Sequence, residues 1–337
     1  MDDGNRPDRP IAEAKPEFSF YIDVFSYCNL RCPSCIVGNE FGDKAEWPRG
    51  LMDVETLRRI LDKATSECLV TSVGVFNWTE PLLNPQLPDL VREIRRRGIS
   101  CRVSSNLNVR EDYDFEALLE AAPNLLRVST SGFTQSIYER GHAGGDVERV
   151  KRNLRRVAEI RRRRSRKTTR FIVFYHIYND NQHEIEPMKA FVEDLGFTFS
   201  TTHAQIFPVE KIIDIREGRV SQSDRKVLDR LSLPLGEALD ITSKEPAESC
   251  VLMDRQMVLD VSGNVMLCCG ASMNRVNALG RYLDLSVEEI QARKNAHGLC
   301  GTCLKVNVPR YFFGSPELED LAARSVPRKP EIARTAP

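Results

Sequence analysis

The stretch FSFYIDVFSYCNLRCPSC, residues 18–35, places a strand-like apolar run directly before three closely spaced cysteines. Cys28, Cys32 and Cys35 are separated by three and two residues, and neither cysteine nor histidine follows them before Cys68. Closed structural metal sites use four such ligands, whereas catalytic sites keep one coordination position open. The missing fourth ligand therefore predicts a metal centre with a position left for something other than protein.

The composition of the 337-residue chain is that of a globular enzyme. Forty-eight basic and forty-eight acidic residues leave no net charge, so the chain as a whole carries no electrostatic signature of a nucleic-acid partner. Residues 1–17 are polar and lack the apolar segment of a secretory signal, and no later run approaches the ~18 apolar residues of a membrane span. We expect a cytoplasmic protein with neither a membrane nor a nucleic-acid partner.

Ten cysteines in a reducing compartment indicate metal binding rather than disulfides. Cys68 and Cys101 stand alone and are expected to pack as small buried hydrophobic side chains. The remaining five lie in the last ninety residues and form a second group: Cys250, Cys268, Cys269, Cys300 and Cys303.

A strand-like run is followed by a helix-like run about six times between residues 18 and 207, which is the pattern of parallel βα units. Asp53 is a candidate N-cap of the first helix, and Asn181 with Glu184 resembles a capping box at the last. Six units predict an α/β fold with a partial (β/α)6 TIM-like barrel, whose chemistry gathers at the carboxyl ends of its strands. The expected strands are 18–25, 72–78, 100–107, 125–132, 169–178 and 198–207, and the expected helices are 53–64, 87–98, 115–122, 147–160 and 181–196.

The composition changes after the barrel pattern and suggests how the chain is divided. We expect a short N-terminal extension, the barrel, a connecting segment, a small α+β domain and a polar tail that frays. The corresponding residues are 1–17, 18–207, 208–249, 250–312 and 313–337.

Local signals add detail to the second half of the chain. The connecting segment has a helix signal at 222–231 and a loop signal at 233–238. The small domain is expected to open with a hairpin that turns at Ser262–Gly263. A helix is expected over 285–298, with its end at Gly298.

The basic run RRRRSRK at 161–167 closes an expected helix, where cations favour the negative end of the helix dipole. A solvated helix end accounts for such a run. Contact with RNA or an acidic peptide is the alternative.

Three thiolates suit a tetranuclear iron–sulfur cluster, which takes one cysteine per iron. Three ligands leave one iron uncovered, and an uncovered iron can bind a ligand that is not protein. A zinc knuckle is the alternative, but it requires a fourth cysteine or histidine nearby.

The pattern Cys28-x3-Cys32-x2-Cys35 after a first strand, within six βα units, resembles the radical S-adenosylmethionine (radical SAM) superfamily. The resemblance implies a [4Fe–4S] cluster on these three cysteines, with an open iron that chelates the amino and carboxylate groups of SAM. It also implies reductive cleavage of SAM to methionine and a 5′-deoxyadenosyl radical, which abstracts hydrogen from the substrate. The electron would come from a reducing partner such as flavodoxin or ferredoxin.

The resemblance assigns further residues to SAM. Asn77-Trp78-Thr79-Glu80 resembles the Gly-Gly-Glu segment of the family, which contacts the SAM amino group, although Trp78 and Thr79 replace the glycines. Ser34 stands where many members carry an aromatic side chain beside the adenine. Serines at strand ends are otherwise turn residues, but the resemblance implies that four polar residues after strands three and four hold the SAM ribose and carboxylate: Ser105, Asn106, Ser129 and Ser131.

The second cysteine group resembles the shortened "twitch" form of the family's auxiliary-cluster domain, which implies one closed [4Fe–4S] cluster on Cys250, Cys268, Cys300 and Cys303. A structural zinc site would use four cysteines equally well. Cys269 either packs beside this cluster or returns a hydrogen atom to a substrate radical. His176 and His203, at expected strand ends, are candidate proton acceptors at the barrel mouth.

A fully ligated auxiliary cluster is suited to accept an electron, so the combination predicts two-electron oxidation of an alcohol to a ketone. The spacing resembles that of an aminocyclitol-oxidising dehydrogenase of the family, which implies a small polar substrate of a natural-product pathway: a sugar, an aminocyclitol or a nucleoside. The alternatives are epimerisation or crosslinking of a ribosomal peptide, and a sugar epimerase that uses Cys269. A non-catalytic iron–sulfur or zinc protein that binds RNA is the alternative from another class.

Overall fold

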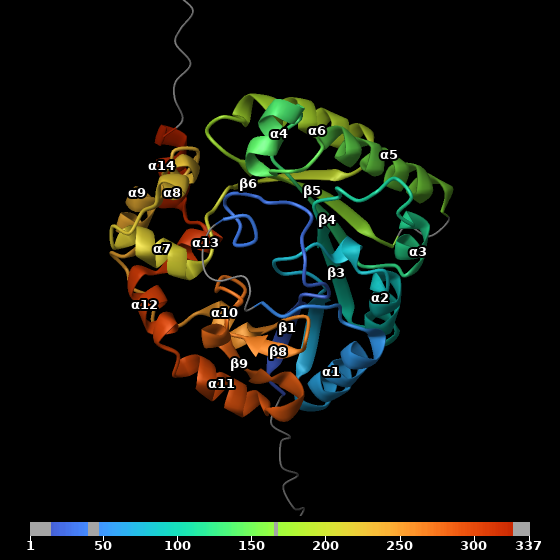
Figure 1. Cartoon of the computed structure of the whole chain (residues 1–337), viewed down its shortest axis with the longest axis horizontal. Coiled ribbons are helices and arrows are strands. Elements are labelled where there is room, and N and C mark those ends of the chain that lie inside the picture. The colour runs from blue at the N-terminus through green and yellow to red at the C-terminus, as the bar shows by residue number, and fades with distance from the viewer. Residues whose placement is uncertain (1–14, 40–46, 165–167, 326–337) are drawn as a thin grey trace, which may run out of the picture.

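The computed structural model describes residues 15–39, 47–164 and 168–325. Within these residues, nine strands form one sheet in the order β6-β5-β4-β3-β2-β1-β7-β8-β9. The mutually parallel strands are β1 (Glu17–Ile22), β2 (Leu69–Gly74), β3 (Ser100–Ser105), β4 (Leu125–Thr130), β5 (Arg170–Ile177) and β6 (Thr198–His203). The sheet curves around a central space (Figure 1), so the predicted α/β partial barrel is confirmed.

The helices between these strands lie on the outside of the curved sheet (Figure 1). They are α1 (Val54–Glu67), α2 (Leu87–Arg96), α3 (Phe115–Glu120), α4 (Gln135–Gly141), α5 (Val147–Arg163) and α6 (Ile185–Asp194). Side chains alternate along β1, where Phe18, Phe20 and Ile22 are buried in the main core. The outward face of the strands therefore packs against the helices, and their other face turns to the central space.

The C-terminal third extends the barrel sheet. Strand β7 (Gln256–Leu259) pairs in parallel with β1 and continues antiparallel into β8 (Asn264–Met266) and β9 (Ala278–Arg281). The predicted hairpin is confirmed, and Gly263 in its turn has φ +79°, a conformation that favours glycine. The hairpin thus shares the barrel's hydrogen-bond network.

Most of the remaining helices lie on the side of the molecule opposite β3 and β4, whereas α11 (Val287–Asn295) lies beside β9 (Figure 1). A second hydrophobic core lies among them and includes Ile212, Leu239 and Leu318. These helices are α7 (Val209–Arg216), α8 (Gln222–Leu228), α9 (Leu235–Thr242), α10 (Val251–Arg255), α11 (Val287–Asn295), α12 (Gly298–Val306), α13 (Val308–Phe313) and α14 (Pro316–Ser325).

One predicted helix cap is confirmed and one is wrong. Asp53 caps α1, where its carboxylate accepts the backbone N–H of Thr56. Asn181 and Glu184 form no capping box, because both side chains have distant partners. Asn181 donates to the carbonyl of Ser131 (2.9 Å), and Glu184 accepts the backbone N–H of Phe133 (2.6 Å).

Three local predictions in the second half are corrected. The helix expected over 285–298 ends at Asn295, and Gly298 instead begins α12, because the side chain of His297 accepts the N–H of Leu299. The loop expected at 233–238 contains the start of α9. The tail does not fray over α14, since Leu318 and Leu321 are buried in the second core.

The second strand is also displaced from its expected position. It ends at Gly74 rather than at Trp78, so residues 75–80 form a loop at the carboxyl end of the barrel. This displacement moves Asn77 and Trp78 out of the expected strand and into the loop that also carries Thr79 and Glu80.

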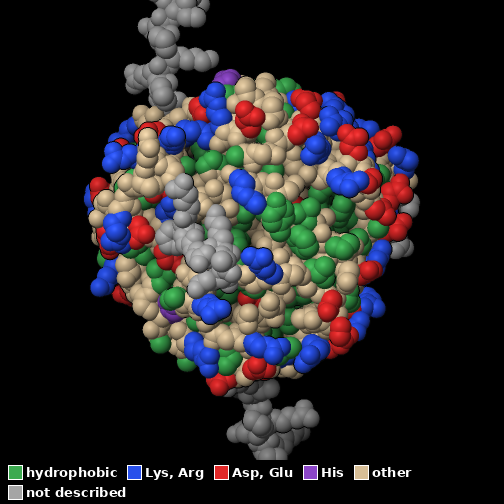
Figure 2. All heavy atoms as spheres, in the orientation of Figure 1, with side chains coloured by type: hydrophobic (Ala, Val, Ile, Leu, Met, Phe, Trp, Pro, Cys, Tyr) green, Lys and Arg blue, Asp and Glu red, His purple; other side chains and the backbone are tan. Residues whose placement is uncertain are grey.

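The basic run closes α5, whose last turn carries Arg161 to Arg163, and residues 165–167 lie outside the described residues. Arg161 donates to the carbonyl of Gly196 (2.7 Å). Basic and acidic side chains are interspersed over the face drawn in Figure 2. No helix in the described parts of the chain is long and apolar enough to cross a bilayer.

Candidate active site

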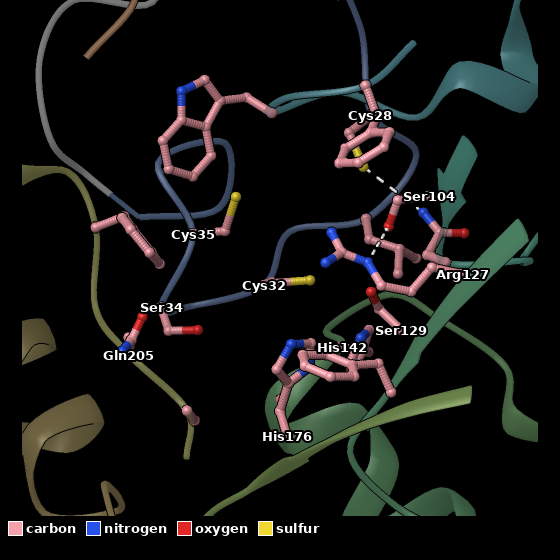
Figure 3. Close-up of a pocket in the computed structure, with 18 of the residues that line it drawn as sticks. Cys28, Cys32, Ser34, Cys35, Ser104, Arg127, Ser129, His142, His176 and Gln205 are labelled. Carbon is pink, nitrogen blue, oxygen red and sulfur yellow. Dashed lines mark hydrogen bonds between the residues drawn. The ribbon is translucent and has the colours of Figure 1, made fainter. Parts of the chain in front are cut away.

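The three N-terminal cysteines follow β1 on a loop at the carboxyl ends of the strands. Cys28, Cys32 and Cys35 line a cavity of about 520 Å³ (Figure 3). The loop is held from both sides of the barrel, because the N–H of Arg31 donates to the carbonyl of Ala143 (2.8 Å) and the carbonyl of Ser34 accepts from Phe207 (2.9 Å). Two backbone hydrogen bonds therefore hold this loop beside the cavity.

The electrostatics of this loop suit a cationic ligand. Burial, followed by the charge of Glu80 and the neighbouring Cys35, raises the pKa of the Cys28 thiol to about 12. Burial and the two neighbouring thiols also raise the pKa of Cys32 well above its usual range. Crowded thiolates repel one another, and bound iron would supply the missing positive charge. The three residues therefore fit the cluster that the sequence predicts.

The second group of cysteines lies in the C-terminal third of the chain, near α7 and α12. Cys250 precedes α10, Cys268 follows β8, and Cys300 and Cys303 lie one turn apart on α12. All four line a common apolar cavity. No disulfide joins any of the ten cysteines. Cys68 and Cys101 are buried, as predicted.

Among the described residues, no three His, Cys, Asp or Glu side chains surround one common metal-ion position. A tetranuclear cluster takes one thiolate per iron, so its ligands need not converge on a single ion. Cluster binding by the two sets of cysteines remains a prediction. The structure shows that the two sets line two separate cavities.

Two side chains organise the second group of thiols. Lys294 is fully buried and donates to the carbonyl of Gln256 (2.5 Å). Its burial lowers the pKa of the ammonium to about 8, although nearby thiols including Cys268 favour the charged form. Glu210 accepts the backbone N–H of Ser272 (3.1 Å), and so anchors the loop that follows Cys268.

The segment predicted to hold the SAM amino group is shaped by Asp23, which the sequence reasoning missed. One oxygen of the buried Asp23 carboxylate accepts the backbone N–H groups of Asn77 (3.0 Å), Trp78 (3.0 Å) and Thr79 (3.1 Å). The hydroxyl of Thr79 also donates to it (2.7 Å). Burial raises the pKa of Asp23 to about 6, against the hydrogen bonds that favour its ionised form. A carboxylate after β1 therefore fixes the loop after β2.

Glu80 is buried at the edge of the same cavity. Its carboxylate accepts the backbone N–H of Asn106 (2.8 Å) and of Leu82 (3.1 Å), while burial raises its pKa to about 7. The amide of Asn106 donates to the Cys28 thiol (3.7 Å) and to Asn29 (3.0 Å). Glu80 and Asn106 thus connect the SAM segment with the first cysteine loop.

The predicted serines occupy different environments. Ser105 lines the cavity, but its hydroxyl accepts the N–H of Leu107 (2.8 Å). Ser129 lines the cavity directly. Ser131 is buried, with its hydroxyl 2.7 Å from Nδ1 of His142, and it is His142 that lines the cavity. The hydroxyl of Ser34 lies 3.0 Å from that of Tyr178 on the cavity wall.

The two predicted histidines and Cys269 also reach the cavity. His176 is half-buried, and desolvation followed by the charge of Arg127 lowers its pKa to about 4. His203 is held through Nδ1 by Ser232 (2.7 Å) and through Nε2 by Glu319 (3.3 Å). Cys269 lines the first cavity, whereas its neighbour Cys268 lines the second.

Sequence reasoning missed several residues of the cavity wall. Arg127 lies two residues before Ser129 on β4, and both line the cavity, as expected for alternating positions of a strand. Phe76 and Phe174 line it as well. Side chains alternate between the two faces of a strand, so counting back two residues from the predicted Ser129 would have placed Arg127 on the same face.

Comparison with known proteins identifies the family. Residues 22–188 match the sequence model of the radical SAM superfamily. This span includes the first cysteine loop, the SAM segment and strands β2 to β5. The chain carries a radical SAM domain and belongs to that superfamily.

Curated relatives match this radical SAM protein over less than half of their own length. A tungsten-containing aldehyde ferredoxin oxidoreductase cofactor-modifying protein of Pyrococcus furiosus is 28% identical over 144 residues, which are 42% of this chain and 39% of the relative. A probable GTP 3′,8-cyclase of Methanococcus maripaludis is 26% identical over 143 residues, 42% of this chain and 46% of the relative.

Solved structures share the architecture. SuiB of Streptococcus suis bound to the precursor peptide SuiA superposes with a TM-score of 0.56 at 13% identity, over 85% of this chain and 66% of SuiB. BtrN in complex with AdoMet and 2-DOIA gives a TM-score of 0.48 at 17% identity, over 87% of this chain and 89% of BtrN. The likeness to SuiB concerns the fold alone.

Proposed function

We propose that this radical SAM protein abstracts hydrogen from a small polar substrate, a sugar, aminocyclitol or nucleoside of a natural-product pathway, in a net dehydrogenation. The observation that supports the proposal is that the three cysteines of the first loop line one cavity, while Cys250, Cys268, Cys300 and Cys303 line a separate one. When bound, SAM and the two clusters would supply the hydrogen-abstracting radical and the acceptor for a second electron. The substrate would lose one hydrogen atom, one proton and one electron, which converts an alcohol to a ketone.

The chain's own residues would bind and orient the two clusters and SAM. Cys28, Cys32 and Cys35 hold the first cluster, and the four thiols near α12 hold the second. The loop fixed by Asp23 and the hydrogen-bonded Glu80 and Asn106 would bind the amino-acid part of SAM. A flavodoxin or ferredoxin would deliver the reducing electron.

The proposal is tested by incubating the anaerobically reconstituted, reduced protein with SAM and following 5′-deoxyadenosine by chromatography. We expect 5′-deoxyadenosine even without substrate, because uncoupled cleavage needs only the cluster and the SAM site. Protein with a complete set of iron and sulfide that forms none would contradict the enzymatic proposal and favour a binding protein, for which the basic end of α5 is the candidate surface.

The position of Cys269 favours epimerisation as a second candidate, because its thiol lines the first cavity and not the second. Under the dehydrogenase proposal, Cys269→Ala keeps product formation within the same order of magnitude. If Cys269 instead returns a hydrogen atom, the variant retains hydrogen abstraction from a deuterated substrate but loses turnover. Deuterium transfer to 5′-deoxyadenosine, measured beside product yield, separates the two outcomes.

A further inference from the structure

Arg127 occupies the wall of the first cavity below the residues expected to hold SAM. It lies on β4 two residues before Ser129, which places it about 7 Å deeper along the strand at about 3.4 Å per residue. Its Nε donates to the hydroxyl of Ser104 (2.9 Å), and its guanidinium group points into the cavity (Figure 3). The remaining N–H groups of the guanidinium therefore face the space where a ligand would lie.

The charge of Arg127 has no counter-ion among the described residues, where no carboxylate lies within ion-pair distance of it. Glu80 is the acidic side chain that lines this cavity, and its oxygens accept backbone N–H groups. Burial, and after it the like charge of the nearby Arg102, lowers the pKa of Arg127. A partly buried cation without an opposite charge is costly unless a ligand supplies one.

Two aromatic rings hold the guanidinium in place. Its central carbon lies 5.1 Å from the centre of the Phe76 ring and 5.4 Å from that of Phe174. These contacts come from β5 and from the loop after β2, so they fix the side chain from two sides. A fixed guanidinium loses little conformational freedom when it binds an oxyanion in a fork geometry.

We propose that Arg127 is the anion-recognition residue of the substrate site and binds a carboxylate or phosphate group of the substrate. This inference rests on the proposed function and narrows it, because a cationic aminocyclitol would be repelled where a sugar acid or a nucleotide would be bound. The oxyanion would lie at the free N–H groups of the guanidinium, at the deep end of the cavity. The reacting carbon would then face the cysteine loop.

The test uses the oxidised holoenzyme saturated with SAM, so that the SAM carboxylate already occupies its own position. Inorganic phosphate or acetate is titrated at constant ionic strength against chloride, and the melting temperature is recorded. We expect a saturable rise with at least one anion in the wild type and in the control variant Arg110→Gln, whose side chain is 87% exposed. The rise should be absent in Arg127→Gln and partly retained in Arg127→Lys. Whether phosphate or acetate acts more strongly distinguishes a phosphorylated substrate from a carboxylic acid.

SAM binding is measured in parallel by equilibrium dialysis, and we expect wild-type affinity in Arg127→Gln. A loss of about ten-fold or more, the loss expected when a charge-assisted hydrogen bond is removed, would assign Arg127 to the SAM carboxylate and overturn the proposal. A wild-type protein that responds to neither anion would also overturn it, even if Arg127→Gln does not fold. Failure of the proposed function appears separately, as the absence of 5′-deoxyadenosine in the wild type.

Discussion

Cys32→Ala is expected to abolish 5′-deoxyadenosine formation and to remove about four irons per chain, because one thiolate serves each protein-bound iron of a cubane. Burial, followed by the charges of Cys35 and Cys28, raises the pKa of the Cys32 thiol, and a bound cluster would relieve this repulsion. Two remaining thiolates leave half of the irons without protein ligands. Iron and sulfide analysis of the anaerobically purified protein, combined with product analysis after reduction, measures both effects.

Cys101→Ala is the matched control for this experiment. Cys101 is a fully buried thiol on β3 that packs in the main core and lines neither thiol cavity. The variant should keep its full iron content and its SAM cleavage. If Cys32→Ala retained either, the first cysteine loop would not be the cluster site and the proposed function would lose its basis.

Cys300→Ala is expected to separate the two centres. It should lower the iron content by about four per chain while 5′-deoxyadenosine still forms, since the first cysteine loop is unchanged. Oxidised product should disappear, because the acceptor for the second electron is lost. The melting temperature should also fall, since the buried Lys294 ammonium would no longer face a complete set of thiolates.

Cys269→Ala serves as the control for the second centre. Its thiol is the immediate neighbour of Cys268 but lines the other cavity, so iron content should be unaffected. Metal analysis of the wild type also distinguishes the zinc alternative. The zinc alternative predicts that the wild type contains zinc and about four fewer irons, and that Cys300→Ala loses the zinc. That result would contradict an electron-accepting role for this site.

Local patterns predicted much of the barrel because each βα unit carries its own signal. The strand over 125–132 and the helix over 147–160 were recognisable from alternation and from three-and-four spacing, and both are present as β4 and α5. Predictions failed where a side chain has a distant partner. Glu184, expected to cap its own helix, instead binds the N–H groups that open α4. Residues 316–325, expected to fray, are helical because Leu318 and Leu321 enter a core contributed by other helices.

The sequence by itself determined the first cysteine loop, because three ligands within eight residues must lie on one loop whatever the rest of the chain does. Only the tertiary structure decided what surrounds that loop. Asp23 organises Asn77 to Thr79 across more than fifty residues, and Arg127 has no counter-ion within the described part of the chain. The physical reason is that hydrogen bonding and charge balance in a closed cavity depend on every side chain that reaches it, and those side chains come from strands far apart in the sequence.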